Sequence, residues 1–272
     1  MISYAQNRED VLLNRLFPAD YKGFYIDVGA NHPNEGSVTA HFYARGWRGI
    51  NVEPSGIYDL VAWARSRDIN LQVAVSNHCG EATLHEFPEA AGLSTFDVNN
   101  AETARNRFGF QYVPRKVPVL TLAEICRQHV KGPVDFLSVD VEGHEPQVLA
   151  GADFRQFRPR VVVVEATKPN TTEPTHALWE NLLLEADYLF AFFDGLNRFY
   201  VRKEDSELIP RLAVPANVHD NYLPYTEFCN TQMGPATLKI AKRLNRIERR
   251  FPRFSEAVLR WWLMWRGSPH VH

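Results

Sequence analysis

The feature that most constrains the fold is an alternation that runs from residue 22 to about residue 200. Short runs of apolar and β-branched residues alternate there with longer amphipathic segments. This pattern is typical of a mostly parallel sheet that carries helices on both faces. With 272 residues, of which 45% are hydrophobic, the chain is long enough for one large α/β domain with a buried core and an appendage.

The predicted strands are short, and several end at a polar residue. They cover residues 24–28, 48–52, 71–75, 81–87, 134–140, 160–166, 188–193 and 198–201. Helices are predicted over residues 6–17 (with Ser3 as a candidate cap), 37–46, 60–64 and 121–128, and after Pro174. The polar stretch 92–115 has few periodic apolar residues and is interpreted as an irregular cover. The short turn 194–197 predicts that the last two strands form an antiparallel pair at the sheet edge.

Acidic residues stand at the ends of four predicted strands. They are Asp27, Glu53, Asp140 and Glu165. In an open parallel sheet, ligands bind at the carboxyl ends of the strands, where the strand order reverses. The four acids therefore predict a ligand site at that edge.

The loop after the first strand narrows the choice of ligand. It reads Gly29-Ala30-Asn31-His32-Pro33-Asn34, with one glycine where a dinucleotide loop has three and with a proline that lacks an amide donor. No Walker sequence follows. The loop instead suits the close approach of an uncharged nucleoside or amino-acid group, and Glu53 is placed one strand-helix-strand unit later to accept hydrogen bonds from ribose hydroxyls.

Cysteine usage and hydropathy indicate the compartment. Cys79, Cys126 and Cys229 show no metal-binding or CxxC spacing, so we expect free thiols in a reducing compartment. Met1 opens a polar stretch, and no window of about 18 apolar residues occurs. The expected location is the cytoplasm.

Six stretches resemble the FkbM family of class I S-adenosylmethionine-dependent methyltransferases. They are "SYAQNREDVLL", "FYIDVGANHPNEGSVTAHFYARGWRGINVEPS", "VAVSNHCGEATL", "DFLSVDVEGHEPQVLAG", "VVVVEATKP" and "DGLNRFYV". They occur in family order between residues 3 and 201. The resemblance implies a Rossmann-like class I methyltransferase fold with a mostly parallel seven-stranded sheet, in a domain over residues 1–228 whose residues 1–21 form a helical cover.

The resemblance also implies a set of cofactor-binding residues. They are Asp27, Gly29, Ala30, Asn31, Ser37, Glu53, Ser76 and Asp140, with Tyr4 and Gln6 from the N-terminal cover. Ser76 and Asn77 are expected near the adenine, where many class I enzymes have an aspartate. This departure leaves the adenine contact open.

The segment Asp140-Val-Glu142-Gly-His144-Glu145 is the candidate for the chemistry. Methyl transfer to a hydroxyl needs a base, and His144 titrates near neutral pH. Asp140 or Glu142 would orient His144 or the acceptor. Asp140 and Glu165 also carry oxygen ligands suited to Mg²⁺, which makes them candidate metal ligands. The structural alternatives are that His144 braces a helix, that Glu142 caps it and that Glu165 is a solvated strand end.

The resemblance implies an O-methyltransferase that acts on sugars, polyketides or other natural-product hydroxyls. We expect a saccharide of a cell-surface glycan, with His32, Glu165 and His219, beside Asp220, as candidate acceptor contacts. A base or amide N-methyltransferase is disfavoured, because no [DNS]-P-P-[YFW] tetrapeptide follows the fourth strand. A catalytically inactive cofactor-binding module is the nonenzymatic alternative.

The C-terminal segment, residues 229–272, differs from the rest of the chain. From Asn230 onward it contains nine Lys and Arg against two Asp and Glu, whereas the whole chain has a net charge of −2. Residues 238–267 predict two basic, Trp-rich helices separated at Pro252. Such helices suit a peripheral contact with the inner face of an anionic membrane, a homo-oligomer contact, or packing on the core. Nucleic acid is not expected as a partner.

Overall fold

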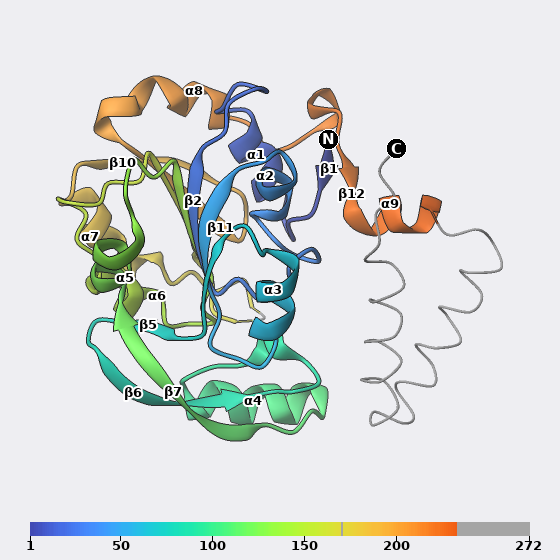
Figure 1. Ribbon diagram of the computed structural model, residues 1–272, viewed down its shortest axis with the longest axis vertical. Helices are drawn as coiled ribbons and strands as arrows, with labels where there is room; N and C mark the ends of the chain where they lie inside the picture. The colour runs from blue at the N-terminus through green and yellow to red at the C-terminus, as the bar shows by residue number, and fades with distance from the viewer. Residues whose placement is uncertain (170, 233–272) are drawn as a thin grey trace. The chain divides into compact units, whose positions relative to one another are not determined.

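The computed structural model describes residues 1–169 and 171–232, and its centre is a seven-stranded sheet. The strand order is β10–β11–β9–β8–β2–β3–β4 (Figure 1). The strands are β2 Phe24–Val28, β3 Arg48–Val52, β4 Ile69–Leu71, β8 Phe136–Val139, β9 Val161–Glu165, β10 Tyr188–Phe193 and β11 Asn197–Arg202. Five of them pair in parallel with their neighbours, and β11 is antiparallel to both β9 and β10. The sheet is therefore mixed, with the predicted antiparallel pair at one edge.

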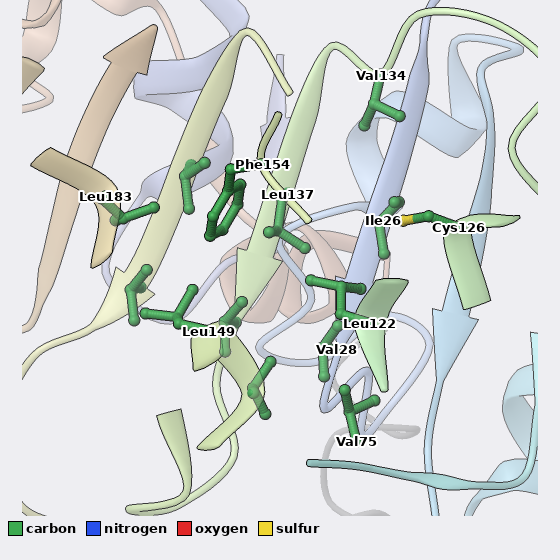
Figure 2. Close-up of a cluster of buried hydrophobic side chains, with 14 of the residues drawn as sticks. Ile26, Val28, Val75, Leu122, Cys126, Val134, Leu137, Leu149, Phe154 and Leu183 are labelled. Carbon is green, nitrogen blue, oxygen red and sulfur yellow. The ribbon is translucent and has the colours of Figure 1, made fainter. Parts of the chain in front are cut away.

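Alternate residues of the central strands pack against helices on opposite faces of the sheet. Ile26 and Val28 of β2 belong to a buried cluster (Figure 2) with residues of three helices. These helices are α5 Leu122–His129, α6 Glu145–Ala150 and α7 Glu180–Leu184. Tyr25, which precedes Ile26 on β2, points to the other face of the sheet and into a second cluster, which contains residues of α1, α2 and α8. Those helices are α1 Glu9–Asn14, α2 Ala40–Ala44 and α8 Ile209–Leu212, and α3 spans Tyr58–Ala64. The strand period of two thus produces the predicted helix–sheet–helix layering.

A second, three-stranded sheet and one helix form a separate group, with β6, β7 and α4 lying together in Figure 1. The elements are β5 Ala74–Ser76, β6 Gly80–Glu86, β7 Val113–Thr121 and α4 Val98–Phe108. The predicted strand 71–75 is wrong as a single element, because residue 71 ends β4 in the main sheet and residue 75 lies in β5 of the small sheet. The predicted irregular cover is also wrong, since residues 98–108 form a capped helix.

The N-terminal segment is tied to residues far along the chain. Strand β1, Ile2–Ser3, pairs in parallel with β12, Leu223–Pro224. The prediction that Ser3 caps the first helix is wrong: residue Arg8 occupies the cap position. The Ser3 hydroxyl instead donates to the buried Asp10 carboxylate at 2.7 Å. Ser3 therefore fixes the segment before the helix.

The remaining described elements are short. They are the 3₁₀ turns Ala91–Leu93, His176–Leu178, Lys203–Leu208 and Val218–Asp220, and helix α9, Tyr225–Gln232. The chain divides into a first compact unit, Met1–Tyr225, and a second that begins at Thr226. The predicted helices over residues 238–267 lie outside the described residues. No helix within residues 1–169 and 171–232 combines the length and apolar character needed to span a bilayer.

Candidate active site

The strand order reverses at β2, and this reversal brings two loops into contact. From β2 the chain continues to β3 and β4 on one side and later returns to β8 and β9 on the other. Gly29, after β2, has φ +87°, and a Cβ built there would lie 1.7 Å from the carbonyl oxygen of Asp140, after β8. Only glycine fits this contact. The reversal point is where open α/β sheets bind ligands.

The Glu53 carboxylate holds the loop that follows Gly29. The backbone N–H of Asn31 donates to Glu53 Oε2 at 2.9 Å, and the N–H of Ser55 donates to Oε1 at 2.8 Å. Each carboxylate oxygen keeps a free lone pair after accepting one bond. Glu53 therefore fixes the loop at the end of β3 and can still accept hydrogen bonds from a ligand.

An open cavity, here named the first cavity, lies at these strand ends. Its strand-end side is formed by Gly29, Asn31, Glu53, Pro54, Asp140, Val141 and Glu142. Its opposite side is formed by Leu84, Ala91, Gly92, Ser94 and Phe96. Three of the four predicted strand-end positions, after β2, β3 and β8, thus meet around one space.

Another open cavity, the second cavity, is lined by α4, by part of the segment before α4, by Glu142 and by Pro169 and Thr171. Between residues 92 and 96 the lining alternates: Gly92, Ser94 and Phe96 line the first cavity, whereas Leu93 and Thr95 line the second. Glu142 lines both. One stretch of chain therefore separates the two spaces, and one residue, Glu142, is common to them.

Acidic groups dominate the electrostatics of this edge. Burial, reinforced by the Asp140 charge, raises the pKa of both Glu142 and Glu165 well above the ordinary glutamate value. Burial also raises the pKa of Glu145 to about 7, although the N–H groups of Val141 and Gly143 donate to its Oε1. Asp140 is accessible from the first cavity. A ligand with positive charge is favoured in such surroundings.

His144 pairs with Ser76, away from the cavity linings. His144 Nε2 lies 3.1 Å from Ser76 Oγ, and burial lowers the histidine pKa. Neither residue is among those that line the two cavities. His144 occupies the cap position of α6, but its side chain makes no capping hydrogen bond. The structure thus joins the predicted base to the residue expected near the adenine.

A family model described as "Methyltransferase FkbM domain" matches residues 27–190. This range is more than half of the chain, and it contains the strand ends, Glu142 and both cavity walls. The chain belongs to the FkbM methyltransferase family. No curated protein sequence matches the chain.

Two solved structures are similar to this FkbM chain. The FkbM methyltransferase from Methylobacillus flagellatus KT is 14% identical, with a TM-score of 0.42, over 66% of this chain and 43% of its own. An O-methyltransferase from Bacillus cereus in complex with SAH is 14% identical, with a TM-score of 0.35, over 73% of this chain and 82% of its own. The chain described here therefore spans less than half of the Methylobacillus protein.

Three predicted cofactor residues form hydrogen bonds within the FkbM domain around the loop that follows β2, outside the lining of the first cavity. Asp27 accepts a hydrogen bond from Thr39 Oγ1 at 2.7 Å, and burial raises its pKa to about 6. Ser37 accepts from the buried Arg65 guanidinium at 3.1 Å. Ala30 donates its N–H to the carbonyl of Val52 at 3.1 Å. None of the three predicted residues is among the residues that line the first cavity.

The N-terminal cover runs beside the same loop, because Ala5 forms a parallel bridge with Gly36. Next to Ala5, the ring of Tyr4 stacks on Tyr225 with centroids 4.8 Å apart, and Gln6 is exposed. Neither Tyr4 nor Gln6 is among the residues that line the first cavity. The N-terminal cover thus lies beside the loop. The cofactor contacts expected for Tyr4 and Gln6 stay predictions.

The three predicted acceptor residues lie apart from one another. His32 Nδ1 accepts the N–H of Glu35 at 2.9 Å and braces its own loop. His219 is exposed in the 3₁₀ turn that precedes β12. Glu165 is buried at the end of β9, and its Oε2 has no hydrogen-bond partner. None of the three is among the residues that line either cavity.

The predicted magnesium ligands gain no support. Asp140 and Glu165 interact with each other. Across residues 1–169 and 171–232, however, no group of three or more His, Cys, Asp or Glu side chains is arranged to hold a metal ion.

Sequence reasoning missed the residues of the opposite cavity walls, since it interpreted their segment as an irregular cover. They include Phe96, Asn100, Thr103 and Phe108. A signal was present at both ends of α4. Asp97 caps the helix through the N–H groups of Asn99 and Asn100, and Gly109 ends it with φ +79°. An N-cap aspartate and a glycine after the last turn are typical helix boundaries.

Proposed function

We propose that this FkbM protein is an S-adenosylmethionine-dependent O-methyltransferase with a Rossmann-like class I fold, and that its acceptor is a saccharide hydroxyl. The observation that supports the proposal is the placement of Glu53 beside the Gly29–Asn31 loop in the first cavity. The same residues were selected as cofactor contacts from the sequence.

The lining of the first cavity fits the cofactor. The Glu53 carboxylate, oriented by two backbone N–H groups, would accept hydrogen bonds from the ribose hydroxyls. Gly29 and Asn31 would let the backbone approach the nucleoside, and Asp140 would favour a cationic ligand. When bound, S-adenosylmethionine supplies a methyl group on a positively charged sulfonium.

Glu142 is the residue that we assign as the base. It lines both cavities, whereas His144 is hydrogen-bonded to Ser76. Burial and the charges of Asp140 and Glu145 raise its pKa, so its ionised form is a stronger base than an ordinary carboxylate, and a cationic ligand in the first cavity would favour that ionised form. Glu142, in its ionised form, would take the proton of the acceptor hydroxyl, and the cofactor would supply the methyl group to that oxygen and leave as S-adenosylhomocysteine. His144 then positions Ser76.

Calorimetric titration with S-adenosylhomocysteine tests the cofactor assignment. The wild-type protein is expected to bind, and Glu53→Ala is expected to weaken binding by about tenfold or more, because hydrogen bonds to a charged group are lost. Glu89→Ala is the matched control, since Glu89 is exposed and is not among the residues that line the first cavity. A wild-type protein that does not bind refutes the proposed function.

Transfer of radiolabelled methyl groups to glycan extracts tests the acceptor class. A labelled glycan supports the saccharide assignment, whereas label in a polyketide or other natural product supports the alternative. Binding of the cofactor without transfer to any extract favours an inactive binding module. We propose a cell-surface glycan because the basic, Trp-rich C-terminal segment suits a contact with the inner face of the membrane.

A further inference from the structure

The second cavity meets the first at Glu142, the residue that we assign as the base. The hydroxyl of Thr95 donates to the Glu142 carbonyl at 3.4 Å, which ties the wall between the cavities to this residue. A Cβ built on the neighbouring Gly143 would lie 3.2 Å from Asn100 Nδ2, so α4 closely approaches the same loop. A molecule in the second cavity would therefore have one end at Glu142 and its length along α4.

Helix α4 presents a single stripe of residues to this space. The stripe consists of Asn100, Thr103, Ala104, Arg107 and Phe108, whose spacing places them on one helix face. A helix face that packs on a core is normally apolar, but this stripe carries an amide, a hydroxyl, a guanidinium and one aromatic ring. The Phe108 side chain is 40% exposed. The composition of the stripe is therefore that of a ligand-binding surface and not that of a helix face packed on a core.

The side chains of this stripe suit a sugar ring. A pyranose has apolar C–H faces and hydroxyls around its edge, so it pairs with an aromatic ring on its face and with amides and hydroxyls at its edge. Asn100 offers both donors and acceptors. The Thr103 hydroxyl donates to the Asn99 carbonyl at 2.8 Å and so offers its oxygen as an acceptor.

We propose that the second cavity holds the acceptor, and that this acceptor is a pyranose ring that stacks on Phe108, hydrogen-bonds to Asn100 and Thr103, and presents a hydroxyl to Glu142. This inference rests on the proposed methyltransferase function. It adds a location for the acceptor and names residues that determine its specificity.

The test measures binding of methyl pyranosides to the full-length protein saturated with S-adenosylhomocysteine. Saturation-transfer NMR is recorded with the methyl gluco-, galacto-, manno- and rhamnopyranosides. At least one is expected to bind through its ring C–H protons. Phe108→Ala is expected to weaken that binding by about tenfold, and Phe108→Tyr to restore it. Asn100→Ala is expected to weaken it by about fivefold.

Two neighbours on α4 provide matched controls. Val98→Ala and Asn99→Ala change exposed residues that are not among those that line the second cavity, and both variants should bind the pyranoside as the wild type does. Absence of binding by all four pyranosides overturns the proposal, as does unchanged binding to Phe108→Ala. The S-adenosylhomocysteine titration separates failure of the acceptor assignment from failure of the proposed function. If S-adenosylhomocysteine binds while no pyranoside does, only the acceptor assignment is lost.

Discussion

Gly29 and Gly36 have similar backbone conformations in different surroundings. Their φ angles are +87° and +76°, but a Cβ at Gly29 would overlap the Asp140 carbonyl, whereas a Cβ at Gly36 would meet nothing within 4 Å. Gly36→Ala should therefore lower the free energy of unfolding only by the left-handed backbone strain, about 1 kcal/mol. Gly29→Ala should cost at least about 3 kcal/mol, because strand-end loops must separate.

Urea denaturation of the two glycine variants measures this difference. The larger loss for Gly29→Ala should be accompanied by loss of S-adenosylhomocysteine binding, because the same displacement opens the loop that Glu53 holds. Equal losses of unfolding free energy in the two variants would show that the contact with Asp140 is not restrictive.

At the strand ends around the first cavity, the positions of residues were more predictable from the sequence than the directions of their side chains. The sequence placed Asp27, Glu53 and Asp140 at strand ends, because buried apolar runs and parallel pairing determine where such strands stop. It did not show that Asp27 accepts its hydrogen bond from Thr39. It also did not show that Glu142 has φ +53°. These directions depend on contacts between segments that are distant in the sequence.

At the scale of elements, α4 depends on its Asp97 cap. The Asp97 carboxylate accepts the N–H groups of Asn99 and Asn100 at 2.7 and 3.1 Å. Asp97→Ala should destabilise the protein by about 1 kcal/mol and increase hydrogen exchange of amides 98–108. Asp153→Ala is the matched control, because Asp153 accepts the N–H groups of Arg155 and Gln156 in the same way.

The two cap variants should differ in ligand binding. Loosening α4 should weaken pyranoside binding in Asp97→Ala, whereas Asp153→Ala should bind normally despite a similar loss of stability. Normal pyranoside binding to Asp97→Ala, with increased exchange in α4, would mean that the helix need not be ordered for the acceptor to bind.

The elements that were predicted correctly carry strong local patterns. The β2, β3 and β10 ranges agree with the sequence because their apolar runs are sharply bounded. Helix α4 was missed because only the small residues Ala101 and Ala104 are buried on it, which leaves no large apolar stripe. Strand β7 contains Pro114 and Pro118, which argue against a strand locally. Both are accepted because they lie opposite β6, whereas the pairing of β7 with β5 begins only at Val119.

At the scale of the whole molecule, Glu9 links the first helix to β11. Its buried carboxylate accepts Asn197 Nδ2 at 2.6 Å and the N–H of Asn7 at 2.8 Å. Burial raises its pKa from 4.5 to about 8. The folded chain therefore holds this proton more tightly than the unfolded chain, and the resulting stability is lost as the pH rises from about 4.5 to 8.

Denaturation of wild type and Glu9→Gln at pH 5.5 and 8.5 tests this assignment. Between the two pH values, the free energy of unfolding of the wild type should fall by roughly 3 kcal/mol more than that of the variant, because glutamine has no proton to release. Asp10, whose pKa burial raises to about 6, is present in both proteins and cancels in the comparison. Equal losses of unfolding free energy in the two proteins would exclude Glu9 as the source of this pH dependence.

Removal of residues 235–272 tests the C-terminal segment, which lies outside the described residues. Deletion should abolish either sedimentation with anionic vesicles or self-association in ultracentrifugation, since basic and tryptophan residues favour such contacts. Titration with S-adenosylhomocysteine should be unchanged, because the residues that line the first cavity all lie between 29 and 142. If vesicle binding and self-association both persist, the segment has neither role.

The alternation between residues 92 and 96 affects how the linings of the two cavities can diversify. Because Leu93 and Thr95 line the second cavity while Gly92, Ser94 and Phe96 line the first, substitutions at positions 93 and 95 would alter the proposed acceptor side and leave the proposed cofactor side intact. If occupancy of one cavity shifts this shared backbone and so changes the affinity of the other cavity, the change must be the same in both directions. Under the proposed function, acceptor preference would therefore evolve one residue at a time without loss of the methyl donor.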